Sequence, residues 1–326
     1  MPLDLDLTYA QVAFKASHNS YERNELPVST QLDSLGDHAA EGRCRGLELD
    51  LNLSGRNWLW SVNHIGGYGG SADQQLAAYL ADIAGWHEAH PEHHVVTVTL
   101  DLKGGRTLDK DARSTSDFSA RLDAALRDAL QDSIFRPRDL RGNKATLLEG
   151  AANWPSLKAL TGKFVFFLSG SGDLKECYAN GAGTDGCCFL DRKFSLGDTF
   201  TPESFPEIVF YNFDVDAWST PEQVARFKQI GRQIAEDGRC ITRGYVVNNS
   251  QMWTRALDAG ISILTTDKIR SHPWASVGAE PFRPRLRPTR SASPSRGTRK
   301  ATAAHRARTA PGTARARKAP GRRRGK

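Results

Sequence analysis

The sequence lacks any long uninterrupted apolar segment. None of its 326 residues belongs to a run approaching 18 consecutive apolar residues, the length that a membrane-spanning helix needs. The first residues also lack the basic and apolar regions of a signal peptide, so we expect none in this sequence. A chain of this length holds one large domain or two average ones.

Acidic residues are missing from the last part of the chain. Residues 283–326 contain 16 lysines and arginines and no aspartate or glutamate. The rest of the chain holds the other 28 basic residues and all 37 acidic ones, so the net charge of +7 conceals an acidic body of formal charge −9. The last residues also contain few large apolar side chains, so burial would not offset the entropy lost on ordering. We expect a folded body, residues 1–275, and a disordered basic tail, residues 276–326.

Cysteine is scarce, and three of the five cysteines fall in one segment, residues 170–191. This cluster favours a zinc site or a disulfide that closes the segment. Zinc is the weaker interpretation, because no histidine lies nearby and the C-x-x-C spacing is absent. A disulfide from Cys177 to Cys187 or Cys188 would suit an exported protein. We expect the other two cysteines, at positions 44 and 240, to be buried thiols.

The hydrophobic pattern alternates between short strand-like runs and helix-like runs. Helical periodicity covers residues 71–90, residues 116–130 and the segment that starts at Thr220. The eight expected strands are residues 12–16, 45–51, 58–62, 95–100, 164–168, 207–213, 241–247 and 261–265. This alternation fits an α/β protein with a TIM-type (β/α)8 barrel, regular or irregular. Residues 151–161 and 170–201 are then long insertions that shape the barrel mouth.

Four of the expected strands end in polar, ionisable residues, and barrels of this type keep catalytic groups at those ends. Glu48 and Asp50 share one face of their strand, because residues i and i+2 point the same way. Two adjacent carboxylates repel each other unless a cation or a proton lies between them. Calcium binds carboxylate and amide oxygens, and Asn19 and Asp101 supply two more of these at neighbouring strand ends.

Two histidines, His18 and His64, complete this set of strand-end residues. Two imidazoles that move protons beside a cation site suit phosphodiester cleavage. Taken singly, the two acids fit a solvated strand face and each histidine fits a hydrogen-bonded loop. We favour a site because all the pieces fall at strand ends in the first third of the chain. Four further histidines, at positions 87, 90, 93 and 94, lie before the fourth strand at the barrel bottom, and we interpret them as solvated surface.

The same residues resemble the phosphoinositide-specific phospholipase C family, and most closely its bacterial calcium-dependent branch. Residues 16–21, A-S-H-N-S-Y, resemble the family motif G-T-H-N-S-Y. Residues 30–34 and 45–50 resemble its Q-L-D-x-G-x-R-x-x-E-x-D motif. Residues 63–64, N-H, match the second histidine, and residues 100–103, L-D-L-K, match the acid of the next strand and the lysine after it. The similarity is good over about the first hundred residues and faint afterwards.

Two positions favour the calcium-dependent branch. Metal-free members have an acid after the first histidine and an arginine two places after the acid of the second strand. This chain has Asn19 and Asp50 there, a neutral ligand and a second carboxylate. The chain departs from the family at Ala16-Ser17 and at Asp101, where the family more often has glutamate. The shorter acid reaches less far toward a metal.

The resemblance implies a calcium-dependent phosphodiesterase that cleaves phosphatidylinositol-type phospholipids to diacylglycerol and a cyclic or acyclic inositol phosphate. It implies the following roles: catalysis by His18 and His64, phosphate binding by Lys103, and calcium binding by Asn19, Glu48, Asp50 and Asp101. His64 would be the general acid, whereas the base is either His18 or a carboxylate. One alternative is a glycerophosphodiester phosphodiesterase, although its H-R-G and E-N motifs differ from H-N-S-Y. Another is a catalytically silent barrel that binds anionic lipid.

The implied partner is a phospholipid at a membrane surface, and we expect a monomer. The basic tail fits contact with an anionic membrane, a nucleic-acid arm, or an extension without function. We weigh the membrane contact and the absence of function equally. Nucleic acid is the weakest interpretation, because membrane contact suits a lipid-cleaving body better. Related proteins are commonly exported and the clustered cysteines agree with that, but no signal peptide is visible, so the compartment stays open.

Overall fold

Eight parallel strands close into a TIM-type barrel in the computed structural model of the chain. The barrel strands are β1 (Val12–Ser17), β2 (Gly46–Leu53), β4 (Val96–Lys103), β5 (Phe164–Gly170), β6 (Cys188–Phe194), β7 (Phe210–Asp214), β8 (Ile241–Tyr245) and β9 (Ile263–Thr266). Each strand pairs in parallel with the next, and β1 pairs with both β9 and β2, which closes the cylinder. The structure describes residues 3–22, 28–32, 44–53, 60–64, 75–103, 115–270 and 272–285.

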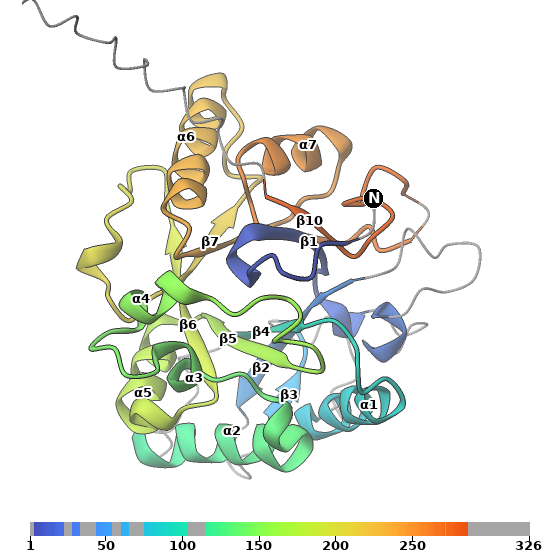
Figure 1. Cartoon of the computed structure of the whole chain (residues 1–326), viewed down its shortest axis with the longest axis vertical. Coiled ribbons are helices and arrows are strands. Elements are labelled where there is room, and N and C mark those ends of the chain that lie inside the picture. Colours follow the sequence, from blue (N-terminus) through green and yellow to red (C-terminus); the bar gives the residue numbers. More distant parts are fainter. Residues whose placement is uncertain are drawn as a thin grey trace, which may run out of the picture. The chain divides into compact units, whose positions relative to one another are not determined.

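Helices surround the strands, as Figure 1 shows for α1 and α2 on one side and α6 and α7 on the other. The helices are α1 (Leu76–Ala89), α2 (Thr115–Leu130), α3 (Pro137–Arg141), α4 (Leu147–Gly150), α5 (Gly172–Ala182), α6 (Pro221–Asp237) and α7 (Ser250–Asp258). Short 3-10 turns are η1 (Tyr9–Gln11), η2 (Ser20–Glu22), η3 (Val28–Gln31), η6 (Gln131–Ser133), η7 (Ala151–Asn153), η8 (Gly183–Asp185) and η9 (Pro202–Ser204). None of the helices in the described ranges is both long and apolar enough to cross a bilayer.

The three expected helices are present, and local capping explains where α6 begins. The Thr220 hydroxyl accepts from the Gln223 N–H (3.3 Å), and the Gln223 side chain accepts from the Thr220 N–H (3.0 Å). This reciprocal pair satisfies two N–H groups that a helix start leaves free, and Pro221 needs no donor at the first position. Residues 71–74, where the first helix was expected to begin, lie outside the described residues.

The strand predictions need two corrections: one expected barrel strand is a hairpin strand, and one barrel strand was not predicted. The expected strand at residues 58–62 is β3 (Trp60–Val62), which pairs antiparallel with β2 and so forms a hairpin beside the barrel. The missing barrel strand is β6, inside the segment that we expected to be an insertion. Its sequence, C-F-L-D-R-K-F, carries three consecutive charged residues that hide the apolar pattern. Asp191 in that run is nevertheless buried, because it pairs with Lys175 (2.6 Å).

The folded body extends beyond residue 275, where we expected the tail to begin. A final strand, β10 (Phe282–Pro284), pairs antiparallel with β1, and the next residue, Arg285, is buried. The compact unit ends at Pro288. Two of the sixteen basic residues assigned to the tail, at positions 283 and 285, therefore belong to the described fold.

The barrel interior changes from aromatic to polar along the strands. Phe167, Phe189 and Phe210 lie in one buried cluster, with the rings of Phe167 and Phe210 stacked at 4.7 Å. Side chains two positions further along a strand point to the same side. Those positions hold Ser169, Asp191 and Asn212, which are buried as well. The apolar layers form the core, and the polar layer lies at the carboxyl ends of the strands.

The expected disulfide at Cys177 is wrong, since all five cysteines are free thiols. The N–H of Cys187 donates to the carboxylate of Asp123 (3.1 Å), and the N–H of Cys188 donates to the hydroxyl of Tyr178 (3.0 Å). These bonds connect the start of β6 to α2 and α5, and both cysteines are buried there. Burial raises the pKa of the Cys187 thiol to about 12, which makes it a poor nucleophile.

Candidate active site

His18 follows β1 and is held by a carboxylate from the other end of the chain. Its Nδ1 lies 2.8 Å from Oδ1 of Asp267, the residue directly after β9. In the neutral imidazole this contact places the proton on Nδ1, so Nε2 faces Glu48 Oε2 at 3.8 Å. Burial acts to lower the pKa of His18, but the hydrogen bond to Asp267 and the charge of Glu48 hold it above its ordinary value.

A short turn after His18 makes hydrogen bonds to Glu48 of β2. Asn19 adopts the left-handed conformation (φ 46°), which asparagine tolerates better than most residues. Its N–H donates to Glu48 (3.4 Å), and its carboxamide oxygen accepts from the Tyr21 hydroxyl (3.3 Å). The Ser20 hydroxyl accepts from the Glu48 N–H (2.9 Å). The turn therefore fixes Glu48 from two sides.

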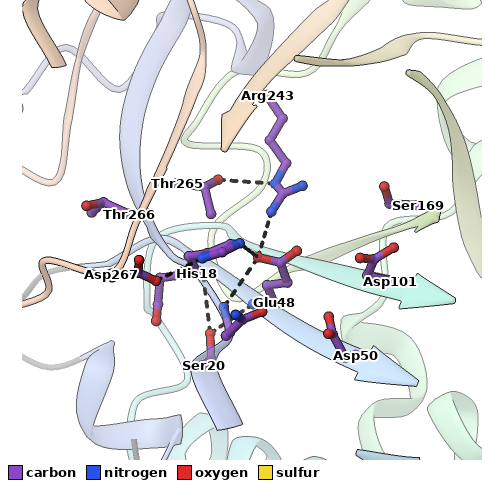
Figure 2. Close-up of polar contacts among 12 residues, drawn as sticks. His18, Ser20, Glu48, Asp50, Asp101, Ser169, Arg243, Thr265, Thr266 and Asp267 are labelled. Atoms are coloured by element: carbon purple, nitrogen blue, oxygen red, sulfur yellow. Dashed lines mark hydrogen bonds and ion pairs between the residues drawn. The ribbon is translucent and has the colours of Figure 1, made fainter. Parts of the chain in front are cut away.

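Glu48 lies at the centre of the polar layer, between His18 and Arg243 (Figure 2). Arg243 Nη2 lies 2.7 Å from Glu48 Oε2, and each side chain is only 3% exposed. Burial acts to raise the pKa of Glu48, but the charges of Arg243 and His18 hold it below its usual value. Glu48 is thus an ionised, paired carboxylate.

Arg243 is itself held by neutral groups of three strands. Its Nε donates to the Thr265 hydroxyl (3.1 Å) and its Nη1 donates to the Asn212 carboxamide (3.3 Å). Asn212 in turn donates to the Ser169 hydroxyl (2.9 Å). The sequence analysis missed Arg243 and Asp267. An arginine inside an apolar strand and an acid directly after a strand were the signals that would have revealed them.

Three acids converge at the ends of β2 and β4. Glu48, Asp50 and Asp101 each offer an oxygen within 4.8 Å of the others, and the register pairs Asp50 with Asp101. Figure 2 shows both aspartates near the tips of neighbouring strands, on the far side of Glu48 from His18. We call Glu48, Asp50 and Asp101 the acid trio.

The carboxylates of the acid trio are crowded and largely buried. Asp50 is fully buried, and the ammonium of Lys103 lies 3.1 Å from its Oδ2, whereas Asp101 Oδ1 has no hydrogen-bond partner among the described residues. Burial, together with the charge of Glu48, raises the pKa of Asp50 to about 7. Burial likewise raises the pKa of Asp101. Buried carboxylates that repel each other fit a hard cation, which prefers such oxygens.

Lys103 lies among the acids of the trio. Its ammonium lies 2.5 Å from Asp101 and 3.1 Å from Asp50. Burial acts to lower the pKa of Lys103, but the charges of both aspartates hold it above its ordinary value. The sequence analysis expected this lysine to bind substrate phosphate, whereas its described contacts are to the carboxylates.

His64 reaches the site through the hairpin. The antiparallel strand β3 returns along β2, and the Asn63 N–H donates to the Asp50 carbonyl (3.1 Å). Asn52 fixes Asn63 through two bonds from its carboxamide nitrogen. His64 follows, half-buried, and its ring has no hydrogen-bond partner among the described residues. The hairpin thus directs the chain at His64 back along β2 to Asp50.

An aromatic and a basic side chain lie beside His18 at the mouth. The ring of Tyr245, the last residue of β8, stacks with the His18 ring at 6.4 Å, and Lys193 Nζ lies 5.9 Å from the tyrosine ring. Burial raises the pKa of the Tyr245 hydroxyl. These two residues were also missed, because a single tyrosine or lysine has no distinguishing sequence pattern.

The expectation that the histidines at the barrel bottom are solvated surface is wrong for His93, which is 7% exposed. Its Nε2 lies 3.0 Å from His87 Nδ1, and its Nδ1 lies 2.7 Å from the His94 carbonyl. His87 Nε2 lies 2.8 Å from the Ser133 hydroxyl. These rings are internal hydrogen-bonding groups rather than surface.

Comparisons with known proteins agree with this geometry. A family model for calcium-dependent phosphoinositide phospholipase C matches residues 62–189. The calcium-dependent phosphoinositol-specific phospholipase C of a Gram-negative Pseudomonas species is 21% identical, covering 87% of this chain and 97% of its own, with a TM-score of 0.66. The calcium-dependent phosphatidylinositol-specific phospholipase C of Streptomyces antibioticus is 25% identical over 85% of this chain and 99% of its own, with a TM-score of 0.62. A search of curated proteins found no match.

Proposed function

Because the chain belongs to the calcium-dependent phosphoinositide-specific phospholipase C family, and is a phosphoric diester hydrolase, we propose that it cleaves phosphatidylinositol-type phospholipids. The products are diacylglycerol and an inositol phosphate, cyclic at first. The observation that carries this proposal is the acid trio, three largely buried carboxylates within 4.8 Å of one another, beside the paired imidazole of His18.

Calcium is the proposed cofactor, held by Asn19, Glu48, Asp50 and Asp101. The close approach of three buried carboxylates supports it, since a divalent cation would offset their mutual repulsion. When bound, calcium supplies a fixed positive charge that neutralises the negative charge developing on the phosphodiester. Asp101 stands where the family more often has the longer glutamate, so its ligation is sensitive to the position of β4.

His18 stabilises charge in the proposed mechanism. The raised pKa of its imidazole favours the protonated form, in which Nδ1–H donates to Asp267 and Nε2–H points into the site. An imidazolium there can donate to a phosphate oxygen, and it has no free nitrogen to accept a proton. A carboxylate of the acid trio is then the base for the inositol hydroxyl.

His64 is the proposed general acid for the diacylglycerol oxygen. The hairpin brings the chain at His64 back alongside Asp50, and no described hydrogen bond holds its ring elsewhere. A proton donor must lie within hydrogen-bond reach of the leaving oxygen. A half-buried imidazole at the mouth meets that requirement once a substrate fills it.

A lipid panel tests the function. The protein is incubated with phosphatidylinositol, phosphatidylcholine and a soluble glycerophosphodiester, each with calcium or with chelator, and phosphorus NMR identifies the products. We expect a cyclic inositol phosphate from phosphatidylinositol in calcium alone. Cleavage of the glycerophosphodiester to glycerol phosphate would favour a glycerophosphodiesterase instead. Turnover of none of them would favour a silent, lipid-binding barrel.

The basic tail is proposed to contact the anionic membrane that contains the substrate, with the protein acting as a monomer. Cationic side chains without acids among them are attracted to anionic lipid surfaces. This contact raises the local concentration of enzyme at the bilayer without changing the chemistry.

A further inference from the structure

The ammonium of Lys103 occupies the position where the acid trio most needs positive charge. It lies 2.5 Å from Asp101 and 3.1 Å from Asp50, and those contacts define ion pairs with two of the three acids. The third acid, Glu48, has its own cation in Arg243 at 2.7 Å. Each carboxylate of the trio therefore has a cationic neighbour from the protein itself.

The charges show that this arrangement cannot accept a further cation unless one of its own cations moves away. Three carboxylates and two cations leave one net negative charge in a largely buried cluster. Adding a divalent ion without moving Lys103 would make the net charge positive and place two cations against the same carboxylates. At such distances in a protein, like charges repel by several kcal/mol. Arg243 is buried at 3% exposure and bonded to Thr265 and Asn212, so it is not the cation that moves.

Lys103 is free to move in a way that Arg243 is not. It is the last residue of β4, its side chain is 17% exposed, and its described contacts are only the two aspartates. A lysine side chain has a flexible four-carbon stem, so its ammonium reaches the mouth while the backbone stays in place. The same face of β4 holds Asp101 two residues earlier, so the displaced ammonium stays beside the site.

We propose that Lys103 is an internal competitor of calcium: it neutralises the acid trio in the metal-free protein, and calcium displaces it toward the mouth. This inference rests on the calcium site proposed above. The competition weakens calcium binding and keeps the metal-free barrel folded. Displacement also turns the ammonium into a free cation at the mouth, where it binds the substrate phosphate. Metal binding and phosphate binding are thereby coupled, and Lys103 has a role in both states.

Calorimetric titration of calcium, in the absence of substrate, tests the competition directly. Lys103→Met removes the ammonium and keeps the stem, so its calcium Kd should fall roughly 5- to 150-fold, the range typical of coupling between sites. Lys103→Arg retains a competing cation and should bind calcium no more tightly than the original protein. Lys158→Met is the matched control, because Lys158 is exposed and has no described side-chain contact. An unchanged or higher Kd for Lys103→Met would overturn the proposal.

Thermal unfolding of the same variants separates competition from a loss of fold. In chelator, Lys103→Met should unfold at a lower temperature than the original protein, because its three acids keep only one cation. Saturating calcium should remove most of that difference. Equal unfolding temperatures in chelator would contradict the role of Lys103 in the metal-free state.

A measurement on the unmodified sequence avoids the variants altogether. An amine-reactive reagent labels lysines, and peptide mass spectrometry follows Lys103 with and without calcium. Displacement predicts faster labelling of Lys103 in calcium and no change at Lys158. Slower or unchanged labelling of Lys103 would overturn the proposal. If neither the original protein nor Lys103→Met binds calcium, the proposed calcium site fails, whereas binding of equal strength by both leaves that site intact and rejects the competition.

Discussion

At the carboxyl end of the barrel, Asp50 is fully buried within 4.8 Å of two further acids, and its cationic partner is Lys103 at 3.1 Å. At the amino end, Arg285 is 6% exposed and donates to four acceptors. These acceptors are the carbonyls of Ala10, Cys240 and Gly260 and the hydroxyl of Thr242. Both ends bury ionisable groups, but only the carboxyl end holds several groups of like charge close together.

The histidines at the amino end follow the same rule as Arg285. His93 Nδ1–H donates to the His94 carbonyl, so its Nε2 must accept from His87 Nδ1–H. His87 Nε2 then accepts from the Ser133 hydroxyl. The contacts therefore assign one neutral tautomer to each ring and leave no ring nitrogen of the pair without a partner. Burial lowers the pKa of His93 to about 4, consistent with the neutral form.

The comparison shows that burial of an ionisable residue does not by itself mark a functional site. Buried polar groups are almost always hydrogen-bonded, as at the amino end. Buried carboxylates that lie close together repel each other and destabilise the fold unless cations offset their charge. The polar groups at the carboxyl end therefore indicate a binding site, whereas those at the amino end stabilise the fold.

The largest expected effect is at His64. His64→Ala should reduce turnover about 10²–10⁴-fold, the usual contribution of a positioned proton donor, with little change in stability. A substrate with a good leaving group needs no protonation, so activity on it should partly return. Steady-state kinetics on both substrates makes the test. An equal loss on both would show that His64 is not the general acid.

Arg285→Met tests the amino end, where the effect should appear in stability alone. It removes the donor from three carbonyls, so the free energy of unfolding should fall by about 3 kcal/mol, while turnover per folded molecule stays the same. Denaturant unfolding measures this loss. Arg283→Met is the control, because Arg283 lies two residues earlier, in β10, is half-buried and has no described side-chain partner. Equal losses for the two variants would remove the distinction between the ends.

Asp50→Asn tests the opposite expectation at the carboxyl end. It removes one charged oxygen ligand, so the calcium Kd should rise roughly ten- to a hundredfold. In chelator at pH 8 the variant should be no less stable than the original protein. The pKa of Asp50 rises from 3.8 to about 7 on folding, so above pH 7 the buried charge opposes folding, and asparagine removes that charge. Calorimetry and thermal unfolding measure the two effects, with the exposed Asp128→Asn on α2 as control. A variant that is destabilised in chelator would mean that Lys103 fully compensates the buried charge of Asp50.

The pH dependence of stability isolates His93. Its pKa falls from 6.5 unfolded to about 4 folded, so the unfolded state binds the extra proton between these values. Stability contributed by the neutral ring is therefore complete above pH 6.5 and is lost as the pH falls toward 4. A shift of this size amounts to about 2 kcal/mol after discounting for partial solvation. Urea unfolding from pH 7 to 4 should show a shallower decline for His93→Gln, and parallel curves would contradict the assignment.

Contacts between site residues that are close in sequence could be predicted, and contacts between residues far apart in sequence could not. Glu48 and Asp50 could be placed together because the i, i+2 spacing puts both on one face of β2. His18 and Asp267 are 249 positions apart, and only barrel closure between β1 and β9 brings them together. Local pattern carries no information about that closure.

The two misread strands have local causes. The three residues of β3 are too few to distinguish a hairpin from a barrel strand. The strand β6 carries three charged residues, of which Asp191 is buried beside Lys175 of α5. The crowding of Asp50 with Glu48 and Asp101 and the hydrogen-bonded pair of His87 and His93 also depend on tertiary contacts, so no sequence pattern separates them.

The smallest expected effect concerns the tail. Its test depends on the residue at which the folded body ends. A chain ending at residue 280 loses β10 and Arg285 and should lose stability for that reason alone. A chain ending at Pro288 keeps both and removes 13 lysines and arginines with no acid among them. This second truncation should leave stability and turnover of a soluble inositol phosphodiester unchanged.

Vesicle binding then isolates the contribution of the tail. Each cation near an anionic surface contributes up to about 1 kcal/mol at low ionic strength, and screening reduces this as salt rises. The chain ending at Pro288 should therefore bind anionic vesicles more weakly than the full chain in low salt, and the difference should fade at high salt. Sedimentation with vesicles of phosphatidylinositol and phosphatidylcholine measures this. Equal binding in low salt would show that the tail does not contact the membrane. That result would leave the difference between the two ends of the barrel unchanged.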